Sequence, residues 1–373
     1  MISRVYIDNF KCFSSFEFHP EPVQLILGDN GSGKTSVYDV LETLREFLTT
    51  GNNVEEGFST STLTAWDSRD SQTFEVEVNG NGGAYEYRLV IDHDRLGERC
   101  RIASERLQFD GRRLYEFDGG DAHLFRDDGS AGPQFPFDWS RSFIATIPER
   151  KDNTKLIWFR ERMNRVFVFS PDPLRMTGHS GRETEKPDRG LHQIASWLRH
   201  LSQETIDVMP SLRDALRDTL EGMVGFRMEK TSETSRELRF EFDFSDESDA
   251  RKNGGGFSLS FDALSDGQRN LVALFTILFA AVGRDSSVLI DEADNYVALR
   301  EIQPWLTALQ DRAEECECQI VLISHHPEII NYLAANHGQV FFRDDSGPSR
   351  TRPFEWKEGE LASPSEIVAR GWE

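Results

Sequence analysis

The segment whose residues carry the most specific chemistry is GDNGSGKT, at positions 28–35. It fits the pattern G-x-x-x-x-G-K-[ST], whose glycines let the backbone N–H groups of a loop point inward around a polyphosphate. Lys34 would neutralise the terminal phosphates, and the hydroxyl of Thr35 would ligate a bridging magnesium ion. A plain glycine turn is the alternative, but a strand before the loop and a helix after it favour nucleotide binding. The residues that we assign to the nucleotide are Gly28, Asp29, Asn30, Gly31, Ser32, Gly33, Lys34, Thr35 and Ser36.

A second candidate is SSVLIDEAD, at positions 286–294, where an apolar run ends in two carboxylates. Asp291 would reach the magnesium ion through a water molecule, and Glu292 would orient or deprotonate the attacking water. Taken alone, such an acidic pair is usually only the end of a strand. Beside a phosphate loop, the pair indicates nucleotide hydrolysis.

Two further segments combine apolar runs with polar side chains. In ALSDGQRNL, at positions 263–271, a hydroxyl, a glycine and the free N–H groups of a helix start would form an anion site. Without context, the same residues are a helix cap formed by Ser265 or Asp266. In VLISHHPEII, at positions 321–330, a buried strand ends in two histidines, an arrangement that elsewhere is more often a surface or capping feature.

The elements that must position these residues follow from the hydrophobic periodicity. Short apolar runs predict strands at 2–9 and 22–27, and apolar residues at three-and-four spacing predict a helix from 37 to 48. Alternation predicts an antiparallel meander over 73–117. Residues 118–142 lack a period and predict a loop, and NRVFVF predicts a buried strand at 164–169.

The rest of the chain changes from a polar stretch at 174–190 to two amphipathic helices, at 191–201 and 212–220, and to an alternating strand at 236–244. Helices and strands then alternate. The predicted helices are 266–282, 299–316 and 326–336, and the predicted strands are 287–291, 319–323 and 339–343. Such alternation predicts an α/β fold with a mostly parallel sheet covered by helices.

The composition is that of a globular protein. The 373 residues are 38% apolar and carry a formal net charge of −22, which argues against general adhesion to DNA or to anionic lipid. No stretch approaches the ~20 apolar residues of a membrane span, and the N-terminal residues do not resemble an export signal. Only Cys316 and Cys318 of the four cysteines are close in sequence. We therefore expect a soluble cytoplasmic protein with free thiols and no membrane partner.

The segment at 263–271 resembles the signature of the ABC-type ATPases, which is close to L-S-G-G-Q, with Asp266 in place of a glycine. The resemblance implies that ATP is the nucleotide and that Ser265, Gly267 and Gln268 contact the ATP held by another subunit. It aligns His325 with the switch histidine, which contacts the terminal phosphate. The implied catalytic residues are therefore Lys34, Glu292 and His325, the implied metal-binding residues are Thr35 and Asp291, and ATP and Mg²⁺ are the implied cofactors. Because the site is shared, the resemblance requires a homodimer or a larger self-assembly.

Within this superfamily, the opening Phe10-Lys11-Cys12-Phe13 and the division of the unit between the two ends of the chain resemble the heads of SMC, Rad50 and RecF proteins. The stretch from LSDGQRNLVALF through DEADNYVALREIQPWL resembles small bacterial AAA-family ATPases of the OLD and RecF-like kind, several of which act beside a separate nuclease in phage defence.

The resemblance implies one ABC-type ATPase domain, a P-loop ABC-ATPase head, over residues 1–373. Its parts would be an N-terminal lobe (1–50), an antiparallel β meander (73–117), a short helical insert (174–235) and a C-terminal lobe (236–345).

Three features depart from the SMC pattern. A glutamine that contacts the metal is expected after the strand near 166–169, but the sequence at 167–173 is FVFSPDP, which leaves the second protein ligand of the metal unassigned. Ala298 stands where SMC-type heads have an aspartate. Two short helices within 190–222 take the place of a long coiled coil.

These observations predict an ATP-hydrolysing, dimerising switch that controls a separate effector, such as a nuclease, in anti-phage defence. The main alternative is a RecF- or Rad50-like DNA-binding ATPase of DNA repair, supported by the basic run from Arg150 to Arg165. Acidic residues interleave with this run, so a solvated helix face competes with a DNA groove. A transporter subunit would need the missing glutamine and a docking surface for membrane helices. A P-loop kinase would lack the signature, and no guanine-reading [NT]-K-x-D motif supports a GTPase.

Overall fold

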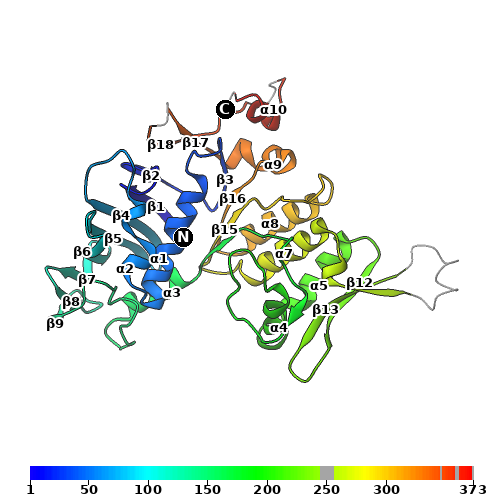
Figure 1. The fold of residues 1–373 in the computed structure, drawn as a ribbon, viewed down its shortest axis with the longest axis horizontal. Coiled ribbons are helices and arrows are strands. Elements are labelled where there is room, and N and C mark those ends of the chain that lie inside the picture. Colours follow the sequence, from blue (N-terminus) through cyan, green and yellow to red (C-terminus); the bar gives the residue numbers. More distant parts are fainter. Residues whose placement is uncertain (244–255, 345–346, 358–360, 372–373) are drawn as a thin grey trace.

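Two β-sheets lie side by side in the computed structural model, which describes residues 1–243, 256–344, 347–357 and 361–371 (Figure 1). The larger sheet is antiparallel and has the strand order β2-β1-β4-β5-β6-β7-β8-β9. Its strands are β1 (Ile2–Asp8), β2 (Phe16–Phe18), β4 (Ser71–Gly80), β5 (Gly83–Asp94), β6 (Arg99–Phe109), β7 (Arg112–Asp118), β8 (Asp121–Phe125) and β9 (Ala131–Pro136).

The second sheet has six strands in the order β10-β15-β16-β3-β17-β18, and all neighbours except β17 and β18 pair in parallel. Its strands are β3 (Val23–Leu27), β10 (Val166–Phe169), β15 (Ser287–Asp291), β16 (Gln319–Ile323), β17 (Gly338–Arg343) and β18 (Ser349–Pro353). A small third sheet contains β11 (His179–Ser180), β12 (Met223–Lys230), β13 (Arg236–Phe242) and β14 (Phe257–Ser260). The mixed α/β class is therefore as predicted, but the larger of the sheets is antiparallel.

The helices lie between and beside these sheets. They are α1 (Lys34–Thr50), α2 (Val54–Gly57), α3 (Thr154–Asn164), α4 (Ile194–Glu204), α5 (Val208–Thr219), α7 (Asp266–Ala280), α8 (Gln303–Glu315), α9 (Pro327–His337) and α10 (Pro364–Ala369). Two 3₁₀ turns, η1 (Thr60–Thr62) and η2 (Phe261–Ala263), complete the elements of the described residues. No helix in these residues is long and apolar enough to cross a membrane.

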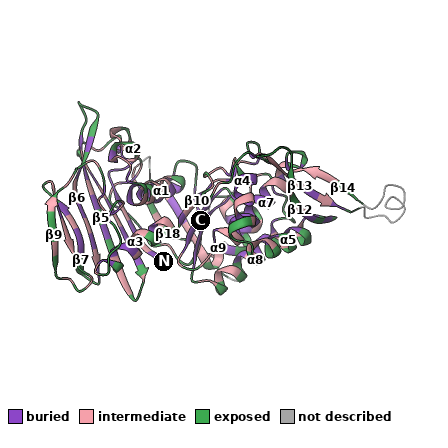
Figure 2. Ribbon diagram, turned by 90° about the horizontal axis from the view of Figure 1, so that it is seen from below, coloured by how far each residue is buried: buried purple, intermediate pink, exposed green. Residues whose placement is uncertain are grey.

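The six-stranded sheet separates two hydrophobic cores (Figure 2). Successive side chains of a strand point to opposite faces, so Val288 and Ile290 join one core and Leu289 joins the other. One core contains α1 and the antiparallel sheet, and the other contains α4, α5, α7, α8 and α9. Burial on both faces explains why β10, β15 and β16 are largely apolar runs, whereas the edge strand β18 is polar and mostly exposed.

Several predicted elements differ from the observed ones for local reasons. Residues 118–142 are not a loop, because β8 and β9 extend the meander; β9 is largely exposed and shows no apolar alternation. The helix predicted from 299 begins at 303, since Pro304 is accepted only in a first turn. The predicted helical insert also contains β11 and β12. The strand predicted at 236–244 ends at Phe242, and residue 244 lies outside the described residues, as do 245–255 and 345 of the predicted C-terminal lobe. The division into lobes stays a prediction.

Candidate functional site

The loop at 28–33 joins β3 to α1 and curls through three glycines with positive φ. A side chain at Gly28 would place its Cβ 2.0 Å from the carbonyl oxygen of Phe341, and Gly33 caps α1 at a φ of 102°. The ammonium of Lys34 folds back over the loop and donates to the carbonyl oxygens of Gly28 (2.5 Å) and Asp29 (2.9 Å). Burial lowers the pKa of Lys34, although the negative charges of Asp291, Asp29 and Glu292 act to raise it.

The acidic pair lies next to this loop, because β15 and β3 are both neighbours of β16 in the parallel sheet. The Thr35 hydroxyl donates to Asp291 Oδ2 at 2.9 Å. Burial raises the pKa of Asp291, although the Thr35 hydrogen bond opposes this rise. The backbone of Glu292 has a φ of 53°, which is unusual for a residue other than glycine. Its side-chain Oε2 accepts from Asn295 Nδ2 at 2.8 Å. This backbone turn separates the buried Asp291 from the exposed Glu292.

The two histidines diverge at the end of β16. His325 is exposed, whereas His326 is buried and caps α9, its Nδ1 accepting from the backbone N–H of Glu328 at 3.2 Å. The Ser324 hydroxyl donates to Asp294 Oδ1 at 2.5 Å and so ties this strand end to the acidic loop. Of the pair, only His325 faces the loop at 28–36.

These residues surround one cavity of about 290 Å³. Its lining is Lys11, Cys12, Asn30, Gly31, Gly33, Lys34, Thr35, Ser36, Asp291, Glu292, Ile323 and His325. The assigned residues Gly28, Asp29 and Ser32 do not line it: the first two hold Lys34 through their carbonyl oxygens. The cavity therefore combines four sequence segments, of which the first and the last, at Lys11 and His325, are 314 positions apart.

The donor groups of this cavity fit a magnesium-bound nucleotide. The Thr35 hydroxyl and the Asp291 carboxylate offer hard oxygen ligands of the kind that magnesium takes. The buried Ser32 hydroxyl has no hydrogen-bond partner among the described residues, and a Cβ added at Gly31 would meet nothing within 4 Å. A polar, open loop beside a lysine provides room and donors for phosphate oxygens.

The third segment is separate from this cavity. Ser265 caps α7 in a capping box: its Oγ accepts from the N–H of Gln268 (3.2 Å), and Gln268 Oε1 accepts from the N–H of Ser265 (3.0 Å). Ser265 is exposed, and neither it nor Gly267 nor Gln268 is part of the cavity lining. The structure therefore gathers the phosphate loop, the acidic pair and His325, but leaves the residues of the predicted signature outside.

Asn270 connects that segment to the acidic loop, a role that no pattern in the sequence indicates. It is fully buried in α7, and its Nδ2 donates to the carbonyl oxygens of Ala293 (3.1 Å) and Asn295 (2.7 Å). Since Asn295 in turn holds Glu292, a short chain of hydrogen bonds runs from the helix of the predicted signature to the predicted base.

Arg189 is a second residue that the sequence analysis missed. Its Nη1 donates to Asp39 Oδ1 (2.8 Å) and Glu42 Oε2 (3.2 Å) on α1, and its Nη2 lies 3.7 Å from Asp291 Oδ2. Burial acts to lower the pKa of Arg189. The hydrogen bond to Asp39 and the charges of the nearby carboxylates outweigh burial and raise this pKa. In the sequence, Arg189 is one of several basic residues in the polar segment 174–190, and no pattern distinguishes it from the others.

Three cations of the basic run at 150–165 make internal contacts. Arg162 is 2% exposed and donates to the Ser287 hydroxyl at 2.6 Å. Arg160 donates to the carbonyl oxygen of Ile147 at 2.7 Å, and the ammonium of Lys155 lies 4.2 Å from the ring centroid of Phe109. Arg150, Lys151 and Arg165 are exposed, and the DNA-binding alternative stays a prediction.

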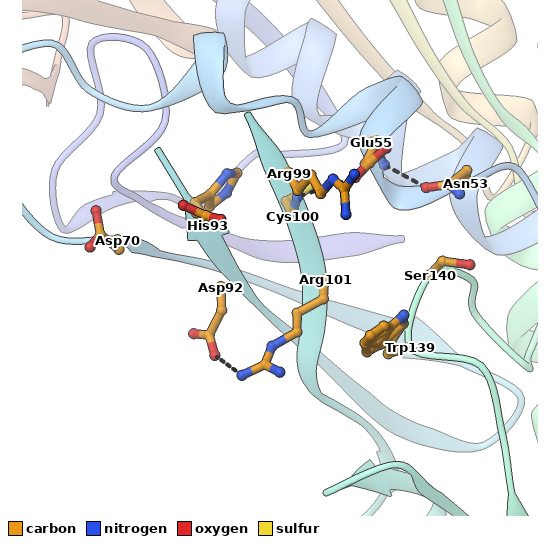
Figure 3. A pocket seen from close by; sticks show the side chains of 11 residues that line it. Asn53, Glu55, Asp70, Asp92, His93, Arg99, Cys100, Arg101, Trp139 and Ser140 are labelled. Atoms are coloured by element: carbon orange, nitrogen blue, oxygen red, sulfur yellow. Dashed lines mark hydrogen bonds and ion pairs between the residues drawn. The ribbon is translucent and has the colours of Figure 1, made fainter. Parts of the chain in front are cut away.

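A larger cavity, of about 750 Å³, lies away from the phosphate loop, among α2, β5, β6 and residues 139–140 (Figure 3). Burial lowers the pKa of His93 to about 4 and raises that of Cys100 to about 12. Near neutral pH, the histidine is therefore uncharged and the thiol protonated, so neither side chain is an activated catalyst. No group of three or more His, Cys, Asp or Glu side chains in the described part of the chain is arranged to hold a metal ion.

Comparison with known proteins identifies the family and the fold. The model of a family described as "AAA domain, putative AbiEii toxin, Type IV TA system" matches residues 25–331, and the chain belongs to this family. The chain therefore contains an AAA domain, and its fold is similar to that of SMC heads. No curated protein sequence matches the chain.

Two solved structures share the fold. An SMC head bound to the C-terminal winged-helix domain of ScpA superposes with a TM-score of 0.57 at 11% identity, over 94% of this chain and 97% of that chain. An SMC head with an extended coiled coil, bound to the C-terminal domain of ScpA derived from Pyrococcus furiosus, gives 0.52 at 10% identity, over 94% and 96%. At these identities the likeness establishes the fold alone.

Proposed function

We propose that this protein is an ATP-hydrolysing switch whose two copies close on each other around ATP and thereby control a separate effector in bacterial defence against phage. The observation that carries the proposal is the division of the site. The phosphate loop, Asp291, Glu292 and His325 surround one cavity, whereas the signature residues lie outside it with Ser265 exposed at the start of a 15-residue helix. The Ser265 hydroxyl accepts from the N–H of Gln268 but can still donate, so this exposed helix start suits the phosphate of a nucleotide held by another copy.

Each residue has a defined part in this scheme. Lys34 and the N–H groups of the loop would bind the terminal phosphates, and Thr35 and Asp291 would hold the metal, which would supply positive charge at the phosphates. Glu292 accepts a proton from the attacking water, and His325 donates a hydrogen bond to the terminal phosphate. Hydrolysis then removes the ligand that favours the closed dimer, because a ligand shifts an equilibrium only by its differential affinity.

The effector is inferred from likeness to other proteins. The family description connects related chains to a toxin of a toxin–antitoxin system. The two SMC heads are each bound to a domain of ScpA, so this type of fold carries protein partners. The small ATPases that the sequence resembles act in several cases beside a nuclease. We therefore propose a nuclease as the effector and the cytoplasm as the location of the switch.

The experiment that tests the switch is a mass measurement of the Glu292→Gln variant by light scattering with saturating ATP and Mg²⁺. The variant should bind ATP, fail to hydrolyse it and run as a dimer. Lys34→Ala under the same conditions is the matched control and should remain a monomer. A Glu292→Gln protein that binds ATP but stays monomeric would refute the shared site, and hydrolysis at the wild-type rate would refute the role of Glu292.

A further inference from the structure

Arg189 places a guanidinium at the carboxylate that is proposed to hold the metal. Asp291 Oδ2 accepts from the Thr35 hydroxyl at 2.9 Å and has Arg189 Nη2 at 3.7 Å. The same guanidinium has closer partners on α1, Asp39 at 2.8 Å and Glu42 at 3.2 Å. Arg189 thus has one long contact with the metal-binding carboxylate and two short contacts beside it.

The backbone fixes this placement. After β10 ends, the chain makes an excursion and returns, so that the N–H of Ser170 donates to the carbonyl oxygen of Arg189 (2.8 Å) and the N–H of Asp172 donates to that of Gly190 (3.1 Å). Because β10 pairs with β15, which ends at Asp291, these two hydrogen bonds hold Arg189 at the carboxyl end of the parallel sheet. The segment after β10, which lacks the glutamine of the SMC pattern, therefore holds an arginine near the carboxylate proposed to bind the metal.

The charges around Arg189 explain why a cation is needed there. The side chains of Asp291, Asp39 and Glu42 are 8%, 25% and 21% exposed, respectively. Three carboxylates that are largely withdrawn from solvent thus lie within 3.7 Å of one guanidinium. Without a cation among them, their negative charges would repel one another at short range.

We propose that Arg189 is a displaceable counter-cation of the metal site: it neutralises Asp291 while no metal is bound and withdraws to Asp39 and Glu42 when Mg²⁺ arrives with ATP. This inference rests on the proposed ATP-dependent function. A divalent ion held by Thr35 and Asp291 repels a guanidinium a few ångströms away, and the longest of the three contacts is the one that gives way. Arg189 thereby sets the metal concentration that the site requires, and in this role it is a positioning residue.

The same movement gives the site a path to the rest of the molecule. Four residues after Gly190, α4 begins at Ile194, and this helix shares a hydrophobic core with α5 and α7 (Figure 1). A short segment therefore connects Arg189 to the helices around the predicted signature. A simple structural ion pair between this segment and α1 would have no such dependence on the metal.

The test measures metal binding without hydrolysis. Wild type, Arg189→Met and Arg189→Lys are titrated with Mn²⁺, followed by electron paramagnetic resonance, in the presence of a saturating non-hydrolysable ATP analogue. Methionine is uncharged and offers no oxygen ligand, so the half-saturating Mn²⁺ concentration should fall by about tenfold. Lysine retains the charge, so its half-saturating concentration should stay close to that of the wild type.

Arg239→Met is the matched control, because Arg239 is 25% exposed against 27% for Arg189 and also contacts two carboxylates, Glu229 at 3.0 Å and Glu237 at 2.8 Å. It should leave the metal titration unchanged. Should Arg189→Met not fold, as judged by thermal unfolding, Arg189→Ala is tested for the same decrease. An unchanged or higher metal requirement in a folded, uncharged variant overturns the inference. A wild type that binds no analogue at any metal concentration instead overturns the proposed function.

Discussion

Glu105 is a carboxylic acid that the fold keeps out of water, and it should make stability depend on pH in a way that one substitution removes. The side chain is 1% exposed in β6 and accepts hydrogen bonds from the Ser142 hydroxyl (2.6 Å) and the Tyr87 hydroxyl (2.9 Å). Burial raises its pKa from the ordinary 4.5 to about 7, although the hydrogen bonds from Ser142 and Tyr87 oppose the rise.

The sign and size of the effect follow from these two pKa values. Below pH 4.5 both the folded and the unfolded chain carry the protonated acid. Between pH 4.5 and about 7 the unfolded chain ionises while the folded chain stays protonated, so the free energy of unfolding falls as pH rises. The difference between these two pKa values corresponds to a decrease of about 3 kcal/mol in the free energy of unfolding, at about 1.4 kcal/mol for each pH unit. Above pH 7 this contribution is constant.

Glutamine at position 105 keeps an oxygen for Ser142 and Tyr87 but has no charge at any pH. The difference in unfolding free energy between Glu105→Gln and wild type should therefore move in favour of the variant by about 3 kcal/mol between pH 4.5 and 8. Urea unfolding of both proteins at several pH values measures this difference, and all other titrating groups cancel. Glu86→Gln, at an exposed site on β5, is the control and should show no such trend. Parallel stability curves for wild type and Glu105→Gln would refute the assignment of a buried, protonated acid.

Three further predictions concern the nucleotide site. Lys34→Ala should abolish binding of a fluorescent ATP analogue, since the loop loses its phosphate-facing cation; retained affinity in a titration would contradict the assignment. Ser265→Arg should lower ATPase activity, and mixing with Lys34→Ala should restore part of it, because each mixed dimer contains one intact shared site; no recovery in a phosphate-release assay argues for a site within one chain. Asn270→Ala removes two hydrogen bonds of about 1 kcal/mol each from the loop that carries Glu292, so single-turnover hydrolysis should slow by about thirtyfold with ATP affinity unchanged. A loss of affinity without a slower chemical step would show that Asn270 acts elsewhere.

Local patterns in the sequence predicted the elements that are buried on two faces or capped. The strands predicted at 287–291 and 319–323 have these bounds in the structure, because strands covered on both faces are continuous apolar runs. The sequence also predicted the start of α7 at Asp266, where Ser265 and Gln268 form a capping box in the structure. Local patterns failed at β9, where an exposed edge strand needs no apolar side chains and so shows no period.

The neighbourhood of each functional residue was decided by the tertiary structure. The sequence by itself determined that a phosphate loop, an acidic pair and a histidine each follow a buried strand, because each is encoded within about ten adjacent residues. Only the order of the parallel strands brought Thr35 to Asp291, 256 positions apart. Likewise, only two backbone hydrogen bonds of a returning segment put Arg189 beside them, and only the packing of α3 turned Arg162 of the basic run inward. Contacts between distant residues depend on which elements pair and pack, and no spacing along the chain records that choice.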